Sequence, residues 1–449
     1  MEKVGVQLRK RLSFQSIKAV SKSEYLRNAA KLTGGTALAQ IIMVLTSPLL
    51  TRLYTPTDFG TFALYNSCVM VLLIISTGRY DIGIVSAKYR NEAVGLLSLS
   101  FLLLFFISLI SAVVMFFGKD LAVVLFDSPQ LREVIFLIPL SVLFLGAYQI
   151  VSYWFNRDKR YNKIAISKVV QNASNMLLAL SIGFFLDWST GLILGNLFGA
   201  MAAAAFVLKK NSLSVNEIKD TVQQEDLKKY ATQFKDFPKY SLPTAFLDTL
   251  SSQIPVFFIV LFFSESFAGH FSFAFRILSI PIALIGVSLG QVFYQKLTEK
   301  FFNQEDCKRF ILRMWGSLFL MGVLPFTVLF LFGETIFQFV FGDNWNEAGK
   351  IASILAIPLF FMFCSSPTST AFIVFGIQRY SLFFGILSVV LRPFAFYIGF
   401  IKGDIYTGLI YWGLFEILAI LIYNVVLLKH ADVQFVREAS KEANSENAS

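Results

Sequence analysis

Long apolar stretches alternating with short polar turns constrain this chain more than any other feature. Between Thr51 and Asp81 one apolar run ends, the turn Thr55-Pro56-Thr57-Asp58 follows, and a second apolar run begins at Phe59. An α-helix rises about 1.5 Å per residue, so about 20 apolar residues cross a hydrocarbon layer of roughly 30 Å. The pattern therefore predicts membrane-spanning helices joined by tight turns.

The composition supports the same class of protein. Of the 449 residues, 56% are hydrophobic and 15% are charged, whereas about 25% are charged in ordinary soluble domains. We therefore interpret the chain as an all-α polytopic membrane protein. Its net charge of +10 does not indicate nucleic-acid binding, because the Lys and Arg residues lie in alternate loops rather than in one patch.

Twelve apolar spans can be assigned along the chain, and this number predicts about 12 transmembrane helices. Most of the 39 Lys and Arg residues fall in loops and tails on one side of this map, which the positive-inside rule identifies as cytoplasmic. An even number of spans then places both termini in the cytoplasm. The spans cover residues 32–54, 58–80, 92–117, 133–155, 164–186, 190–208, 240–263, 267–294, 310–332, 347–376, 381–402 and 405–428.

The longest hydrophilic segment divides the chain into two halves of six spans. The predicted parts are a basic cytoplasmic N-terminal segment (1–31), a first six-helix bundle (32–208), a cytoplasmic linker (209–239), a second six-helix bundle (240–428) and a cytoplasmic tail (429–449). Halves with even span numbers can be copies related by a pseudo-two-fold axis along the membrane normal.

Short sequence matches between the halves indicate such a duplication. Gly60-Thr61-Phe62 resembles Gly269-His270-Phe271 at an offset of 209 residues. Ile138-Pro139-Leu140 likewise matches Ile357-Pro358-Leu359 at an offset of 219 residues.

Polar residues recur at helical spacing inside several spans, which places them on shared faces. Arg276 and Arg392 lie on two such faces, Asp248 on a third, and Lys168 with Asn175 on a fourth. Ionisable groups at membrane depth are costly unless they face a cavity or a partner. We expect these faces to line one hydrated cavity; the alternative is that small polar residues only allow the helices to pack closely.

Three carboxylates could bind a coupling ion. Asp248 and Glu416 lie within spans and Asp81 lies at the end of a span, and a desolvated carboxylate is a plausible carrier of a proton or of Na⁺. The alternative is a structural salt bridge to Arg276 or Arg392.

Neither a catalytic site nor a metal or cofactor site is expected from the sequence. The two His and three Cys residues lack metal-ligand spacing, and there is no P-loop. No segment is long enough to form a separate soluble catalytic domain.

Four segments closely resemble the polysaccharide flippases of the multidrug/oligosaccharidyl-lipid/polysaccharide (MOP) exporter superfamily. They are TRLYTPTDFGTFALYNS from Thr51, RYDIGIVSAKYRNEA from Arg79, FPKYSLPTAFLDTLSSQIPVFFI from Phe237 and GQVFYQKLTE from Gly290. The resemblance implies two six-helix bundles facing each other in a V, with a central cavity that opens alternately to the two sides of the membrane.

The same resemblance implies the cargo, the site and the location. Such flippases move an undecaprenyl-pyrophosphate-linked oligosaccharide, such as an O-antigen or capsule repeat unit, across the bacterial inner membrane. Basic cavity residues receive the anionic groups, and Arg79, Lys168, Arg276 and Arg392 match that role chemically. A glycan polymerase and a chain-length regulator are the partners that the resemblance suggests.

Two other functions remain open at this stage. A cation-coupled drug exporter of the same superfamily is expected to have a more acidic cavity, so Arg276 and Arg392 argue against it. A membrane-embedded glycan polymerase or ligase is expected to carry a large external loop, and the predicted external loops are short.

Overall fold

A computed structural model describes residues 22–186, 188–210 and 224–431. The parts of the predicted terminal segments and linker at residues 1–21, 211–223 and 432–449 lie outside this description. Every regular element in the described residues is helical, so the predicted all-α class is confirmed.

Within the described residues, twelve long helices occupy the positions of the twelve predicted spans. Ten of them are long and apolar enough to cross a membrane; the other two are α3, whose apolar part is Gln40–Leu53, and α9, which contains Lys163 and Lys168. The twelve are α3 (Lys22–Leu53), α4 (Pro56–Ser76), α6 (Arg90–Phe126), α8 (Leu137–Arg157), α9 (Tyr161–Phe185), α10 (Gly191–Lys210), α13 (Leu242–Phe262), α14 (Glu265–Phe302), α15 (Cys307–Phe341), α16 (Asn346–Ser365), α18 (Gln378–Ile401) and α19 (Ile405–His430).

Short helices fill several of the connections between these long ones. They are α5 (Tyr80–Ser86), α7 (Pro129–Val134), α12 (Gln224–Gln233), a π-helix at Phe237–Ser241, 3-10 helices at Asp343–Trp345 and Ser366–Thr370, and α17 (Ala371–Val374).

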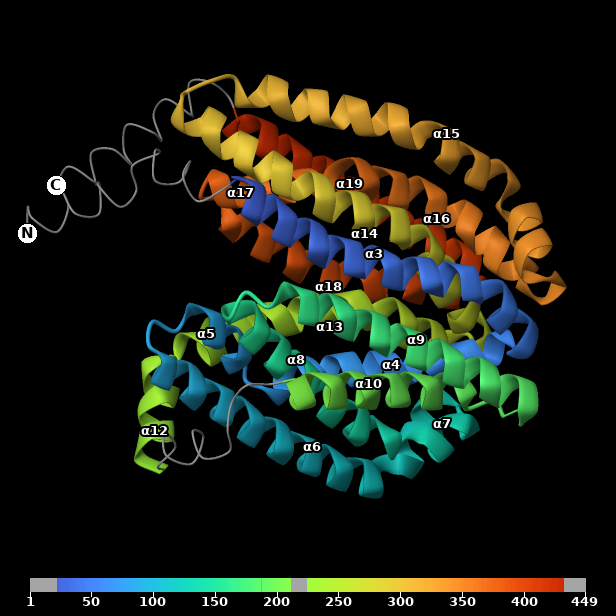
Figure 1. The fold of residues 1–449 in the computed structure, drawn as a ribbon. Helices are drawn as coiled ribbons and strands as arrows, with labels where there is room; N and C mark the ends of the chain where they lie inside the picture. The colour runs from blue at the N-terminus through green and yellow to red at the C-terminus, as the bar shows by residue number, and fades with distance from the viewer. Residues whose placement is uncertain (1–21, 187, 211–223, 432–449) are drawn as a thin grey trace, which may run out of the picture.

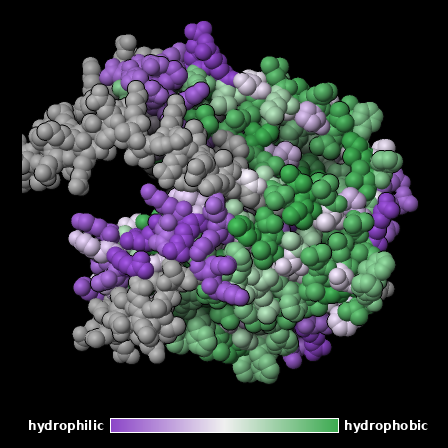
Figure 2. Space-filling view, viewed as in Figure 1, coloured by the Kyte–Doolittle hydropathy of each residue, from purple (hydrophilic) through white to green (hydrophobic). Residues whose placement is uncertain are grey.

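The long helices run side by side along one direction (Figure 1). A wide apolar surface covers the middle of the molecule, and polar side chains gather mainly at the end that carries α5 and α12 (Figure 2). We call this end the linker end. This distribution is the one expected of helices that cross a membrane together.

The turn between α3 and α4 forms as its sequence predicts. Thr55 is the N-cap of α4; its hydroxyl accepts from the Asp58 N–H, and the Asp58 carboxylate accepts from the Thr55 N–H. Pro56 occupies the first turn, where it needs no backbone donor. This capping box sets the start of α4 and therefore the height of Gly60 along the helix.

The two halves of the chain meet where α4 crosses α14 at two glycines. A Cβ on Gly60 would lie 1.9 Å from the carbonyl oxygen of Glu265, and a Cβ on Gly269 would lie 1.8 Å from that of Pro56. Both pairs, Gly60 with Gly269 and Pro56 with Glu265, are separated by the 209 residues of the predicted repeat. A reciprocal contact of this kind is what a pseudo-two-fold axis between duplicated halves produces. We call it the glycine crossing.

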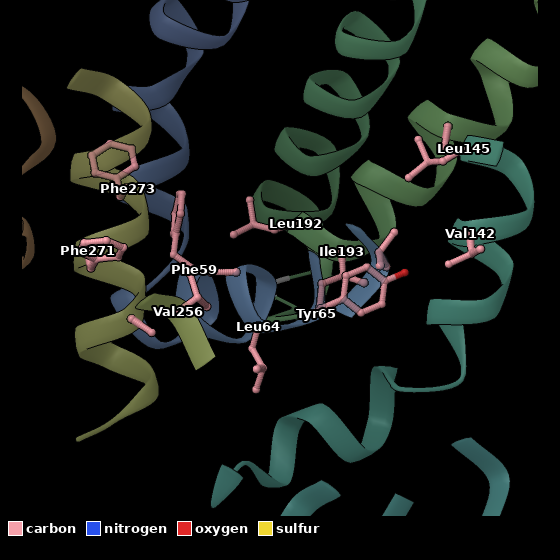
Figure 3. Packing of buried hydrophobic residues seen from close by; sticks show 14 of the residues in the cluster. Phe59, Leu64, Tyr65, Val142, Leu145, Leu192, Ile193, Val256, Phe271 and Phe273 are labelled. Carbon is pink, nitrogen blue, oxygen red and sulfur yellow. The ribbon is translucent and has the colours of Figure 1, made fainter. Parts of the chain in front are cut away.

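Aromatic side chains pack around the glycine crossing. The ring of Phe59 lies 5.4 Å from that of Phe273 and 4.8 Å from that of Trp345, centroid to centroid. The Trp345 indole N–H donates to the carbonyl of Thr51 at 3.0 Å. Figure 3 shows Phe59 on α4 near Phe271 and Phe273 on α14. This end of the interface is therefore tightly closed.

Helix α12 belongs to the predicted linker, yet it is attached to the first half of the chain. The Tyr80 hydroxyl of α5 donates to the carbonyl of Ala231 at 3.1 Å, and the Gln233 amide donates to Glu92 of α6 at 2.8 Å. The segment that leads into α13 is therefore fixed at the linker end, close to α5.

Substitution of Gly60 tests the glycine crossing. A Gly60→Val side chain would overlap backbone atoms that cannot rotate away, so we expect a loss of about 3 kcal/mol in the free energy of unfolding and a lower melting temperature in detergent. Gly316→Val is the matched control, because no heavy atom lies within 4 Å of a Cβ on Gly316. Equal melting temperatures for the two variants would contradict the close contact.

Candidate functional site

A cavity of about 520 Å³ lies between the two halves, next to the glycine crossing. Residues of α4, α10, α13, α14, α16, α18 and α19 form its walls. Aromatic rings, including Phe59, Phe271 and Trp412, cover part of this surface. The polar lining residues are Asn66, Ser67, Asn196, Ser252, Gln253, Ser272, Arg276, Arg392 and Glu416.

Arg392 in this cavity is held by protein groups on two other helices. Its Nε donates to Glu416 of α19 at 2.6 Å, and its Nη1 donates to the carbonyl and the hydroxyl of Ser251 of α13 at 2.5 and 2.9 Å. One arginine on α18 thus ties together three helices. Of the two alternatives for Glu416, the structure shows the salt bridge to Arg392.

Arg276 of α14 lines the same cavity, and the described residues offer it no ion pair or hydrogen bond. One turn away the Ser272 hydroxyl is buried and has no hydrogen-bond partner, and the same holds for the Asn196 carbonyl oxygen of α10. Buried polar groups are normally paired, so this part of the wall is arranged to bind a polar guest.

The charges of the cavity do not cancel. Glu416 compensates Arg392, which leaves the Arg276 guanidinium as a net positive charge among the lining residues. A cation in a low-dielectric wall attracts anions strongly. Planar guanidinium groups also suit phosphate and carboxylate oxygens because they can donate two parallel hydrogen bonds.

Arg79 and Asp248 do not line this cavity. They line a second pocket at the linker end, also of about 520 Å³. Asp81 is fully buried, and its carboxylate accepts from the Thr77 hydroxyl at 2.9 Å and from the Gln149 amide at 2.6 Å.

The two residues predicted on α9 do not line the central cavity either. A side chain on Gly195 or Gly199 of α10 would overlap Asn175, so Asn175 lies in a close α9–α10 contact, as the packing alternative describes. Lys168 lies two turns earlier on the same helix. A role for these two residues in substrate binding stays a prediction.

Sequence reasoning did not identify the amide side chains of the cavity. Asn66, Asn196 and Gln253 each stand within apolar spans, and the Ser67 hydroxyl donates to Gln253 across the interface of α4 and α13 at 2.9 Å. Their polarity within an apolar span was the available signal. In the described part of the chain, no group of three His, Cys, Asp or Glu residues could hold a metal ion.

Comparisons with known proteins place the fold and the family. The family model described as polysaccharide biosynthesis protein matches residues 49–350. An inward-facing multidrug resistance MATE family transporter of the MOP superfamily is similar at a TM-score of 0.71, with 15% identity over 89% of this chain and 96% of that one. The lipid II flippase MurJ in an inward closed conformation is similar at a TM-score of 0.72, with 13% identity over 93% of this chain and 91% of that one.

An outward-facing MATE family transporter gives a lower TM-score of 0.56, with 14% identity over 92% of this chain and 96% of that one. No curated protein matches the sequence.

Removal of one partner tests the Arg392–Glu416 pair. Glu416→Ala leaves the partly buried guanidinium uncompensated, so we expect a loss of about 3 kcal/mol in stability. The double variant Arg392→Met with Glu416→Leu should lose clearly less than the sum of the single Arg392→Met and Glu416→Leu changes. Melting temperatures in detergent measure the effect, and strictly additive losses would contradict a direct pair.

Proposed function

Because the chain belongs to the polysaccharide biosynthesis protein family and has the fold of MOP superfamily transporters, we propose that it flips an undecaprenyl-pyrophosphate-linked oligosaccharide repeat unit. Movement is from the cytoplasmic to the periplasmic leaflet of a bacterial inner membrane. The single observation that carries this proposal is the unpaired Arg276 in a polar cavity between the two halves.

The cavity chemistry supports an anionic, hydroxyl-rich headgroup. Arg276 would receive the pyrophosphate, and the nearby Ser272 hydroxyl and Asn196 carbonyl oxygen have no hydrogen-bond partner among the described residues. Sugar hydroxyls in hydrocarbon cost several kcal/mol each when unpaired, so the headgroup needs polar walls along its path between the two halves. The polyprenyl tail can remain in lipid, which is as apolar as the tail itself.

The closed end of the interface supports an alternating-access mechanism. We propose that the linker end faces the cytoplasm, in agreement with the charge distribution of the loops, and that the glycine crossing closes the periplasmic side. The structure then represents an inward-facing state, and its greater similarity to an inward-facing transporter than to an outward-facing one supports this assignment. Separation of α4 from α14 at the glycine crossing would open the cavity outward.

Ion coupling is proposed at one of three carboxylates whose surroundings differ. Glu416 neutralises Arg392, Asp81 is buried among neutral donors, and Asp248 is exposed in the linker-end pocket.

A partnership with a glycan polymerase and a chain-length regulator belongs to the same proposal. A cationic drug is a poorer cargo than a lipid pyrophosphate, because Arg276 would repel it.

Substitution of Arg276 tests the proposed function in cells. Arg276→Ala should remove most surface glycan and cause lipid-linked repeat units to accumulate on the inner leaflet, whereas Arg276→Lys should retain part of the activity. Glycan staining and analysis of extracted lipid-linked units measure both effects.

The control is Arg132→Ala, since Arg132 is exposed and pairs only with exposed Asp120. It should leave both readouts unchanged. Normal surface glycan in an Arg276→Ala strain that contains normal amounts of the protein would contradict the assignment of the cavity.

A further inference from the structure

The linker-end pocket is a second cavity that shares no lining residue with the central one. Arg79 lines it from the first half of the chain, and the residues that lead from the π-helix into α13 line it from the second half. It therefore lies between the two halves, at the end that the glycine crossing leaves free.

The pocket contains a donor and an acceptor without protein partners. The Arg79 Nε is buried and has no hydrogen-bond partner. The exposed Asp248 carboxylate forms no ion pair or hydrogen bond with the described residues. Arg79 also has a left-handed backbone with φ of 63°, and strained conformations of this kind are concentrated at functional sites. These features indicate a site built to hold a polar ligand.

Aromatic rings form the apolar part of the pocket. Phe237 and Tyr240 both belong to the π-helix Phe237–Ser241, and π-helical turns are frequent at functional sites. Tyr240 is 60% exposed. Phe237 packs against α5, because a Cβ on Gly83 would lie 3.2 Å from its ring. The aromatic wall is thus held in place by the first half of the chain.

The charges exclude a simple anion site. Asp236 at the exposed rim and Asp248 together outweigh Arg79, so these three lining residues carry a net negative charge. The hydroxyls of Ser241 and Thr244 add neutral hydrogen-bonding groups. Carboxylates that accept from hydroxyls, a guanidinium that donates to them and rings that cover an apolar face suit a saccharide.

We propose that this pocket binds the sugars of the cargo and that the phosphates of the cargo bind elsewhere. The proposal rests on the proposed function, and it divides the cargo between two sites, with the pyrophosphate at Arg276 and sugars at Tyr240 and Asp248. The size of the central cavity favours this division, because pockets of roughly 300–1,000 Å³ hold one small molecule. A repeat unit of several sugars extends beyond such a volume.

Binding of a phosphate-free probe tests the proposal. The probe is the repeat-unit oligosaccharide of the source strain, released from its lipid pyrophosphate by mild acid. Its affinity for the full-length protein in detergent is measured by saturation-transfer NMR titration. Tyr240→Ala and Asp248→Asn should each weaken binding about tenfold, the effect expected from loss of one stacking contact or one charged hydrogen bond. Arg276→Ala should bind as well as the wild type.

A matched aromatic variant controls for surface effects. Tyr89→Ala removes a tyrosine that is also 60% exposed and also carries a neighbouring lysine over its ring, as Tyr240 does, but Tyr89 does not line the pocket. This variant should bind normally. Maltotriose, an unrelated trisaccharide, should bind clearly less tightly than the repeat unit.

Three results would overturn the proposal: loss of binding in Arg276→Ala alone, equal binding of maltotriose, or no binding of the free oligosaccharide to any form. None of these results would contradict the proposed flippase function, which is tested separately by movement of the intact lipid-linked unit. Failure of that movement in the wild type would instead reject the proposed function.

Discussion

The backbone contact between α4 and α14 is the interaction on which the rest of the structure depends. Only glycine allows the Gly60 and Gly269 backbones to approach this closely, and the same contact brings Phe59 against Phe273 and Trp345. Closure at this one point leaves the interface free to widen into a cavity next to it. Its reciprocal form agrees with the predicted duplication of the chain, because both glycine contacts are related by the same offset of 209 residues.

The polar groups of the interface have two kinds of environment. Arg392, Glu416 and Ser251 satisfy one another within the second half, whereas the Arg276 side chain, the Arg79 Nε and the Asp248 carboxylate have no hydrogen-bond or ion-pair partner among the described residues. Unpaired charges are costly at membrane depth, and a cargo with phosphates at one end and hydroxyls along the rest would satisfy all three. In the proposed flippase, the paired groups would stabilise the structure and the groups without a partner would bind the cargo.

The sequence predicted the helices well, and it predicted some of the residues that line the candidate cavity. Apolar runs located twelve long helices, and helical spacing brought Arg276 and Arg392 to one cavity. Helical spacing did not predict that Asn175 packs against α10 rather than lining the cavity. Spacing groups residues on one face of a helix, but the neighbouring helix that this face contacts, here the glycines of α10, is set by tertiary packing. The two prolines that match at an offset of 219 residues also occupy different positions in their helices, since Pro139 lies in the first turn of α8 whereas Pro358 lies in the interior of α16. Tertiary packing settles both questions, and a single sequence does not record it.

Transbilayer movement in proteoliposomes tests the central claim most directly. Purified protein is reconstituted with its lipid-linked repeat unit, and the units on the outer leaflet are oxidised by impermeant periodate. With the wild-type protein nearly all units should become accessible, whereas Arg276→Ala and protein-free vesicles should both leave about half protected. Equal protection with and without the wild-type protein would contradict the account, and so would full access with Arg276→Ala.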